Sequence, residues 1–264
     1  MDILKRSLAP LTDEAWKEIE TRAQEVFESY LSARKFIHVE GPLGWNYTVL
    51  AEGRLTNIEG KDGEVYTGIY EAKPLIETRI NFELSRWEMD NLIRGAKDID
   101  LSPLEEAARK SALFEENVLY NGHASANIQG LQNASSHKPL PFGNNGSEIM
   151  DAITEGMLLL KRSFTKKPYT LVVGKETLKR IQREIQGDSL NKRITELLGG
   201  DIVYSEVADG ALLVPYDHED LEMTIGRDFS IGYETADEKR VQLFITESFT
   251  FRILDPDLIV KFTI

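Results

Sequence analysis

Cysteine is absent from this sequence of 264 residues. Its absence excludes a disulfide framework, thiolate catalysis and cysteine-ligated zinc or iron, and it is consistent with a reducing cytosol. The chain also lacks a run of about 18 apolar residues, the length that a membrane-spanning helix needs. Residues 1–6 lead into no apolar signal core. We therefore expect a cytoplasmic protein with no membrane partner.

The signatures of enzymes are missing as well. There is no P-loop, no dinucleotide-binding glycine motif, no nucleophile elbow and no H-E-x-x-H motif. The four histidines lie far apart and none pairs with another at metal-ligand spacing on a helix, so we expect no metal site. His218, between Asp217 and Asp220, fits a solvated acidic turn better than a cation site. Nothing in these patterns predicts an enzyme.

Basic residues are in the minority. The chain has 31 Lys and Arg against 44 Asp and Glu, a formal net charge of -13. This charge disfavours nonspecific binding to nucleic acid or to anionic membranes. Hydrophobic residues make up 41% of the chain, enough for one large domain or two modest ones.

Residues 241–253 carry the clearest pattern that is present. Apolar and polar side chains alternate there, which predicts a long strand with one buried face. Glu247 falls on the apolar face, where a carboxylate needs a partner or a shifted pKa. It is either catalytic or, as we favour, bonded to a backbone group or an arginine, or turned outward by a bulge near Phe244. The preceding residues, 226–234, form a turn-rich apolar segment.

An amphipathic helix is predicted after Thr12, which can cap it. It either packs on its own core or offers a groove to another chain. Its apolar stripe consists of Trp16, Ile19, Ala23, Val26, Phe27, Tyr30 and Leu31.

Residues 48–71 predict two strands joined by a turn at residues 59–63. Few large apolar residues line them, so the hairpin is either an arm stabilised by a partner chain or an ordinary edge of a larger sheet. A further strand is predicted for residues 74–84. A long helix should then begin with a capping box at Ser102 and end at Gly122.

Residues 122–146 are rich in turns and mark a change of domain. The segments that follow alternate between helical and strand patterns and predict an α/β module. Its expected helices begin near Ser147 and cover residues 175–185 and 190–198, and its expected strands cover residues 169–173, 202–204, 211–214 and 221–225.

Trp87 is a candidate ligand site. Arg86 stands beside it and Arg79 a short distance before it. Such a tryptophan could stack a planar anionic ligand such as a flavin, with an arginine on its phosphate. A core or interface tryptophan is the competing interpretation.

The chain resembles the encapsulins, bacterial nanocompartment shell proteins once described as linocin-like bacteriocins. The matching stretches are residues 4–12 with Trp16, 34–36, 39–42, 44–45, 74–77, 87–88, 90–92, 101–102, 104–106, Gly226 with Asp228, 230–234, 243–247 and 249–251. They follow one another along the whole chain.

The resemblance implies an α+β chain with the tailed-phage major capsid fold (the HK ninety-seven type). Its parts would be an N-terminal helix and the start of a peripheral domain (1–47), an extended arm (48–73), more peripheral domain with a spine helix (74–133), an axial domain (134–221) and terminal peripheral strands (222–264). Many copies would close into an icosahedral shell. The axial turn Gln186, Gly187, Asp188 and Ser189 would line a five-fold pore that meters small substrates.

In that family the shell encloses a cargo enzyme, commonly a ferritin-like iron-oxidising protein for iron storage or a peroxidase against oxidative stress. A short apolar peptide at the C-terminus of the cargo is captured in a groove of the shell. Carried over to this chain, the groove would be formed by Val26, Phe27, Tyr30, Leu31, Arg34, Ile37 and His38 on one side and by Asp228, Phe229, Ser230 and Ile231 on the other. His38 departs from the family, which often carries an acid there, so peptide specificity or its pH response would differ.

The resemblance leaves two other functions open. A phage or prophage major capsid protein enclosing DNA would share the fold, and a hydrolase or bacteriocin is the older description of the family. We expect partners to be further copies of this chain and the cargo protein, with no nucleic acid and no required cofactor.

Overall fold

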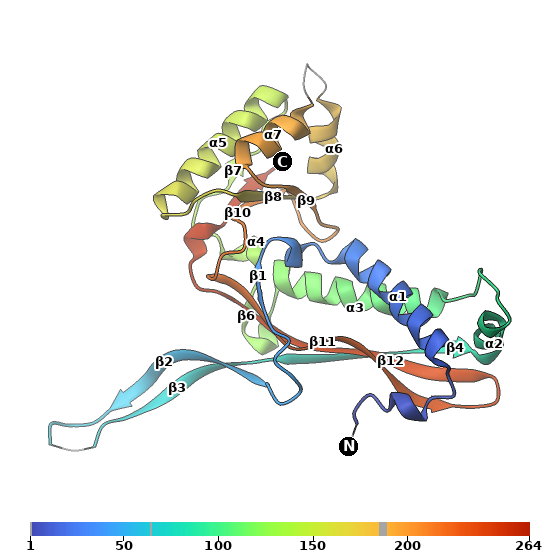
Figure 1. The fold of residues 1–264 in the computed structure, drawn as a ribbon. Coiled ribbons are helices and arrows are strands. Elements are labelled where there is room, and N and C mark those ends of the chain that lie inside the picture. Colours follow the sequence, from blue (N-terminus) through green and yellow to red (C-terminus); the bar gives the residue numbers. More distant parts are fainter. Residues whose placement is uncertain (1, 64, 185–188) are drawn as a thin grey trace.

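The computed structural model describes residues 2–63, 65–184 and 189–264. It has two sheet-based units and a projecting hairpin (Figure 1). We call the four-stranded sheet with its covering helices the peripheral unit, the five-stranded sheet with its helices the axial unit, and the hairpin the arm. The element order mixes helices and strands, as the predicted α+β class requires.

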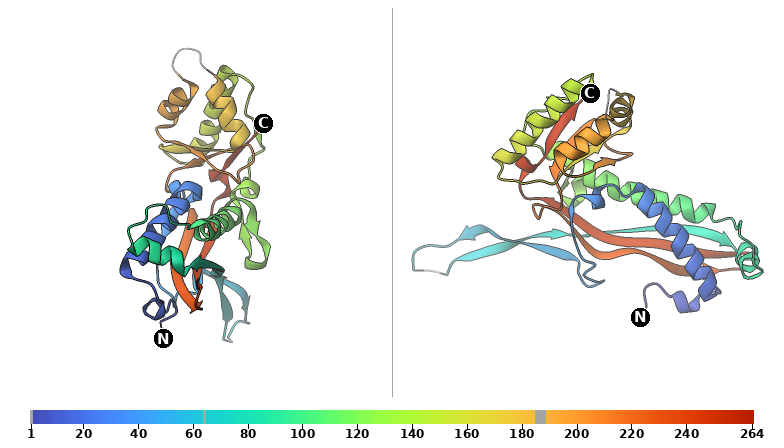
Figure 2. Two further views of the ribbon diagram at one scale, coloured as in Figure 1. Left: turned by 90° about the vertical axis from the view of Figure 1, so that its right-hand side faces the viewer. Right: turned by 45° about the horizontal axis from the view of Figure 1, so that its top comes forward.

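The peripheral unit is built on a sheet with strand order β1-β11-β12-β4. β1 is parallel to β11, whereas β11, β12 and β4 are antiparallel. Three helices lie along this unit (Figures 1 and 2). The bounds are β1 His38–Glu40, β4 Ile76–Ser85, β11 Leu221–Ala236, β12 Arg240–Ile253, α1 Asp13–Tyr30, α2 Arg86–Ile93 and α3 Ser102–Asn121.

The ends of α1 and α3 test the capping predictions. Thr12 caps α1 as predicted, because its Oγ1 accepts a hydrogen bond from the N–H of Ala15 at 3.2 Å. The capping box predicted at Ser102 is wrong: Leu101 occupies the cap position, and the Ser102 hydroxyl donates to Asp100 at 2.5 Å instead. α3 ends at Gly122 as predicted, with φ +88 at that residue.

β12 differs from the prediction in two ways. Its side chains are buried on both faces, not one, because it is a central strand between β11 and β4 and helices cover the sheet. It pairs with β4 in unbroken register, so the bulge expected near Phe244 is not in this strand. The bulges lie in β11, at the register shifts between Ile225 and Arg227, Arg227 and Ser230, and Tyr233 and Thr235.

The arm consists of β2 Val49–Glu59 and β3 Thr67–Pro74, which pair only with each other. It extends away from both units (Figures 1 and 2), so the hairpin is not an ordinary edge of a larger sheet. Its stabilisation by a partner chain stays a prediction. Several large apolar side chains on it are exposed, although a stable monomer would bury them. They are Val49, Leu55, Ile58, Val65, Tyr66, Ile69 and Tyr70.

The axial unit contains a sheet of order β7-β13-β10-β8-β9. Its final strand, β13 Val260–Thr263, was expected with the peripheral strands in residues 222–264, but it pairs with β10 and β7. The reason is a short 3-10 helix, Pro256–Leu258, after which the chain turns into the axial sheet. The other bounds are β7 Leu140–Pro141, β8 Tyr169–Val173, β9 Ile202–Tyr204, β10 Ala211–Pro215, α5 Gly146–Arg162, α6 Lys175–Arg183 and α7 Leu190–Leu198.

A continuous apolar core joins the two units. Val172 and Leu212 of the axial sheet and Phe249 and Phe251 of β12 belong to one buried cluster.

Among the described residues, no helix has the length and hydrophobicity to cross a bilayer. The short elements between the units and near the N-terminus are β5 Gly122–His123, β6 Ile128–Gln129, α4 Leu131–Ala134 and the 3-10 helices Arg6–Leu8, Ala33–Lys35 and Ala124–Ala126.

Candidate functional site

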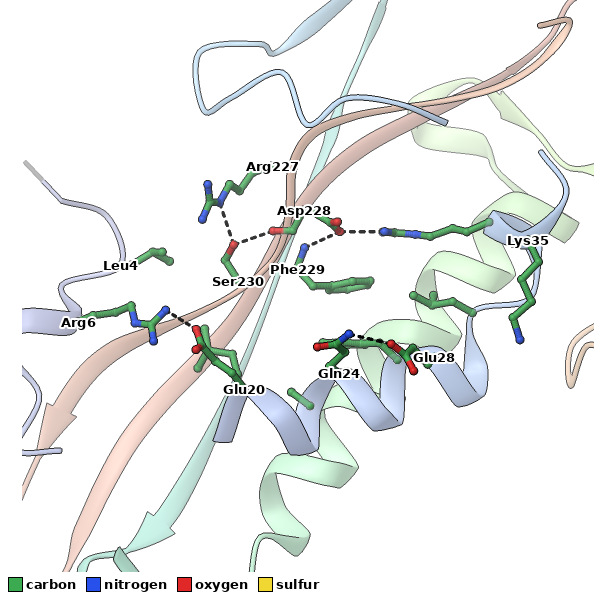
Figure 3. Close-up of a pocket in the computed structure, with 15 residues that line it drawn as sticks. Leu4, Arg6, Glu20, Gln24, Glu28, Lys35, Arg227, Asp228, Phe229 and Ser230 are labelled. Atoms are coloured by element: carbon green, nitrogen blue, oxygen red, sulfur yellow. Dashed lines mark hydrogen bonds and ion pairs between the residues drawn. The ribbon is translucent and has the colours of Figure 1, made fainter. Parts of the chain in front are cut away.

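A groove of about 930 Å³ separates α1 from the bulged part of β11 (Figure 3). We call it the docking groove. Apolar and charged side chains share its walls. They are Leu4, Arg6, Glu20, Ala23, Gln24, Phe27, Glu28, Leu31, Arg34, Lys35, Arg227, Asp228, Phe229, Ser230 and Ile231.

Two aromatic rings from opposite walls meet in the groove. Phe27 of α1 stacks on Phe229 of β11, with ring centroids 4.2 Å apart and an interplanar angle of 12°. The Arg34 guanidinium carbon lies 5.1 Å from the centroid of the Phe229 ring. The two phenylalanines remain partly exposed, so an apolar guest could bury them further.

One end of the groove is fixed by Arg34. Its guanidinium contacts three carboxylates: Asp228 at 2.9 Å, and the buried Glu115 at 2.6 Å and Glu247 at 2.5 Å. Burial would lower the pKa of Arg34, but these carboxylates outweigh burial and raise the pKa, so the cation is permanent. Burial and the neighbouring Glu115 raise the pKa of Glu247 well above its ordinary value. The 2.5 Å contact with the Arg34 guanidinium shows that Glu247 is bonded to an arginine, one of the interpretations favoured from the sequence.

A second buried carboxylate lies behind this end. Glu116 of α3 accepts hydrogen bonds from the N–H groups of Ser32 and Ala33, each at 2.9 Å, and pairs with the hydroxyls of Ser32 and Ser205. Burial raises its pKa to about 7. The turn after α1 is thus tied to α3, which holds Arg34 in place.

The other end is closed by the N-terminal segment. The carbonyl of Leu4 accepts a hydrogen bond from the N–H of Tyr233 at 2.8 Å. Arg6 pairs with Glu20 of α1 at 2.6 Å, and Arg227 donates to the Ser230 hydroxyl at 2.8 Å (Figure 3). The groove therefore has a polar boundary at each end and an aromatic pair between them.

The structure brings seven of the eleven predicted cargo-contacting residues to this groove: Phe27, Leu31, Arg34, Asp228, Phe229, Ser230 and Ile231. Val26 and Tyr30 instead line a separate hollow with Tyr204, because they lie on another face of α1. Ile37 is in the buried core. His38 bonds Asp217 at 2.8 Å and does not line the groove.

The sequence interpretation named Arg34, Asp228 and Ser230 but missed the other polar residues of the groove and Leu4. Glu20, Gln24 and Glu28 stand four apart on α1, one position from the apolar stripe, and this spacing could have revealed a polar rim. Leu4, Arg6, Lys35 and Arg227 reach the groove only through the tertiary fold, which no local pattern predicts.

The residues proposed for a flavin are not together. The Arg79 guanidinium lies 4.1 Å from the Phe244 ring centroid on β12, whereas Trp87 is on α2 with Arg94 at 5.5 Å. Arg79 and Ser85 are six residue steps apart along β4, roughly 20 Å. Arg86 donates to the carbonyl of Asp237 at 3.0 Å. Trp87 itself is 66% exposed.

Of the four residues expected at a pore, Gln186, Gly187 and Asp188 lie outside the described residues. Ser189 is described and caps α7, where its hydroxyl accepts a hydrogen bond from the N–H of Lys192 at 3.3 Å.

Comparison with known proteins decides the family. The family model described as "Encapsulating protein for peroxidase" matches residues 1–250. The chain belongs to this family. It is 34% identical over 264 residues to a type 1 encapsulin shell protein of Mycolicibacterium paratuberculosis, covering all of both chains, and 33% identical over 268 residues to that of Rhodospirillum rubrum, covering 98% of this chain and 96% of the other.

Solved structures agree on the fold of this encapsulin-family chain. The virus-like particle from Pyrococcus furiosus matches with a TM-score of 0.66 at 15% identity, over 92% of this chain and 97% of that one. A Gordonia phage Cozz chain matches with a TM-score of 0.57 at 12% identity, over 89% and 86%. These matches confirm the tailed-phage capsid fold. Because encapsulin relatives are named as shell proteins, the chain is a structural subunit rather than an enzyme.

Proposed function

We propose that copies of this chain assemble in the bacterial cytoplasm into a closed icosahedral shell around a cargo enzyme of the ferritin-like or peroxidase class. The cargo is held by a short apolar peptide at its C-terminus, which binds in the docking groove. The observation that carries the proposal is the exposed part of the Phe27 and Phe229 pair between two polar ends. Such a site suits an extended peptide with a few apolar side chains.

The arm supports assembly. An isolated hairpin is marginal in water, and this one exposes apolar side chains such as Leu55, Ile69 and Tyr70. A neighbouring subunit of the same kind would cover them, and closed symmetry would repeat that contact around the shell.

Two finer parts of the proposal concern small molecules. The segment with Gln186, Gly187, Asp188 and Ser189 would border pores that admit substrates of the cargo. A flavin stacked on Trp87 would meet Arg94 rather than Arg79, given the contacts of each arginine. Loss of flavin absorbance from purified shells of Trp87→Ala, with retention in Arg79→Ala, is the expected result.

Microscopy and a loading assay test the main proposal. Purified protein should give closed particles by negative stain and elute as a large assembly in size-exclusion chromatography. A fluorescent protein carrying the C-terminal peptide of the enzyme encoded beside this chain should co-elute with the particles, and the same protein without the peptide should not. A monomer under native conditions would contradict the shell, and particles that copurify with DNA would favour the phage-capsid alternative.

A further inference from the structure

The edge of β11 that faces the docking groove is open over a short stretch. Before this stretch, β1 pairs with residues 222–224, and the N–H groups of Leu43 and Gly44 bond the carbonyls of Ile225 and Gly226. After it, the carbonyl of Leu4 pairs with the N–H of Tyr233. Between the segments that pair with this edge, residues 227–231 of β11 line the groove.

The register of the sheet shows which backbone groups point into the groove. Ile231 pairs with Ile245 and Tyr233 with Leu243 in an antiparallel ladder, in which successive residues point their N–H and C=O alternately toward and away from the partner strand. The N–H of Tyr233 points away from β12, because it bonds Leu4. Ile231, two residues earlier with no shift between them, must point its N–H and C=O the same way. No hydrogen bond joins either group to another described segment.

Polar groups of the bulge just before Ile231 form hydrogen bonds with one another. The Asp228 side chain accepts from the N–H of Phe229 at 2.8 Å, and the Asp228 carbonyl accepts from the Ser230 hydroxyl at 2.7 Å. Ile231 is thus the residue of this stretch with a backbone donor and acceptor both aimed at the groove. An unpaired strand edge of this kind is a template for an added strand.

We propose that the cargo peptide binds by adding a short strand to β11, with one peptide residue exchanging hydrogen bonds with the N–H and C=O of Ile231. This rests on the proposed function of the groove. The length of the added strand is limited at both ends. Leu4 already bonds the edge at Tyr233, and the Arg34–Asp228 ion pair crosses the other end. The five residue steps from Asp228 to Tyr233 span roughly 17 Å, enough for about five peptide residues.

Strand addition also predicts which peptide side chains meet the aromatic pair. Side chains of a strand point alternately to its two faces, so every second peptide residue would face α1 and contact Phe27 and Phe229. The peptide should therefore alternate, with apolar side chains at two positions separated by one residue. Backbone pairing supplies affinity, and the aromatic pair selects the side chains.

An N-methyl scan of the synthetic cargo peptide tests the proposal on assembled shells, with fluorescence anisotropy as the measure of binding. Methylation removes one N–H at a time and keeps every side chain. We expect a loss of affinity of tenfold or more at the position facing the Ile231 carbonyl and less than threefold at its two neighbours. Binding of the unmodified peptide with equal losses at all positions would overturn strand addition while leaving the groove assignment intact.

A protein variant gives an independent check. Ile231→Pro removes the N–H that points into the groove but no bond to β12, whereas Ile231→Val keeps the N–H. We expect shells of Ile231→Pro to bind the peptide at least tenfold more weakly than those of Ile231→Val. If the proline variant fails to assemble, the peptide scan decides. Failure of the unmodified peptide to bind wild-type shells would refute the proposed function itself, and binding of a peptide of residues 2–11 in its place would assign the edge to a second copy of this chain.

Discussion

Phe27 and Phe229, 202 positions apart in the chain, stack with their ring centroids 4.2 Å apart. One ring is carried by α1 and the other by the bulged part of β11. Substitutions of these two residues therefore test whether cargo binds in the docking groove.

Truncating both rings should empty the shells of cargo. Phe27→Ala with Phe229→Ala removes the apolar contact for the peptide but touches neither the arm nor the axial sheet, so particles should still form. We expect cargo in the particle fraction to fall at least tenfold, measured by gel densitometry after size exclusion.

Tyr30→Ala is the matched control for that experiment. It truncates an aromatic ring on the same helix, but one that lines the separate hollow with Tyr204. Loading should stay within twofold of wild type. Equal loss of cargo in both variants would contradict the assignment of the groove.

Removing the cation of Arg34 should destabilise the fold. Arg34→Ala leaves Glu115 and Glu247 buried without their counter-charge, which costs about 3–5 kcal/mol in comparable cases. Asp228→Asn is the control, because the Asp228 side chain is 47% exposed and its pairing should contribute less than about 1 kcal/mol. Urea unfolding followed by tryptophan fluorescence measures both, and similar costs would show that the buried carboxylates do not depend on Arg34.

Glu116 should make stability fall as the pH rises. Its pKa is about 7 in the folded chain against an ordinary 4.5, so the folded state holds the proton more tightly. Stability from this group is complete below pH 4.5, declines as the pH rises to about 7 and is level above that. The decline amounts to roughly 3 kcal/mol.

Glu116→Gln tests this pH dependence. An amide can keep the bonds to the Ser32 and Ala33 N–H groups without a charge. The variant should lose less stability than wild type between pH 4.5 and 7.5, measured by urea unfolding. Glu155→Gln, at an exposed position of α5, should follow wild type. A Glu116→Gln curve parallel to wild type would refute the role of burial.

His38 should affect stability and not cargo binding. Its hydrogen bond to Asp217 raises its pKa, so the stabilisation is complete below about pH 6.5, the ordinary value. It is lost as the pH rises through the raised pKa. His38→Gln should lower the melting temperature at pH 5.5 and leave it unchanged at pH 9. The affinity of His38→Gln shells for the cargo peptide should match wild type at both pH values. A pH-dependent difference in affinity would show that His38 contributes to cargo binding.

Apolar residues of the arm should be needed for assembly and not for folding. Leu55 and Tyr70 are partners in the arm register and are exposed. Leu55→Ser with Tyr70→Ser should give folded subunits by circular dichroism but no closed particles by negative stain. Thr56→Ser with Thr67→Ser, a polar change in the same arm, should assemble normally. Normal particles from the first variant would show that the arm contacts do not hold the shell.

The sequence predicted elements well where one local signal dominates. Thr12 caps α1, Gly122 ends α3, and β2 and β3 pair as a hairpin whose connection overlaps the turn predicted at residues 59–63. It failed at Ser102, because a serine can bond a neighbouring side chain instead of the helix, and here it bonds Asp100.

The candidate site was predicted in part. Resemblance placed Arg34 and Asp228 in the groove, but nothing local indicates that they bond each other or that Glu115 and Glu247 share the same guanidinium. The resemblance also assigned Val26 and Tyr30 to the groove, whereas the apolar stripe of α1 is divided between the core and two hollows. Such a division depends on which segments pack beside the helix, and these come from distant parts of the chain.

The path of the chain limits how this subunit can be re-engineered. β13 lies between β7 and β10, although β11 and β12 of the other unit precede it in the sequence. A transplant of residues 134–221 into another shell protein would carry an axial sheet with its second strand missing. Hybrid subunits should therefore take residues 256–264 along with that segment, or be joined by circular permutation so that the two pieces become one.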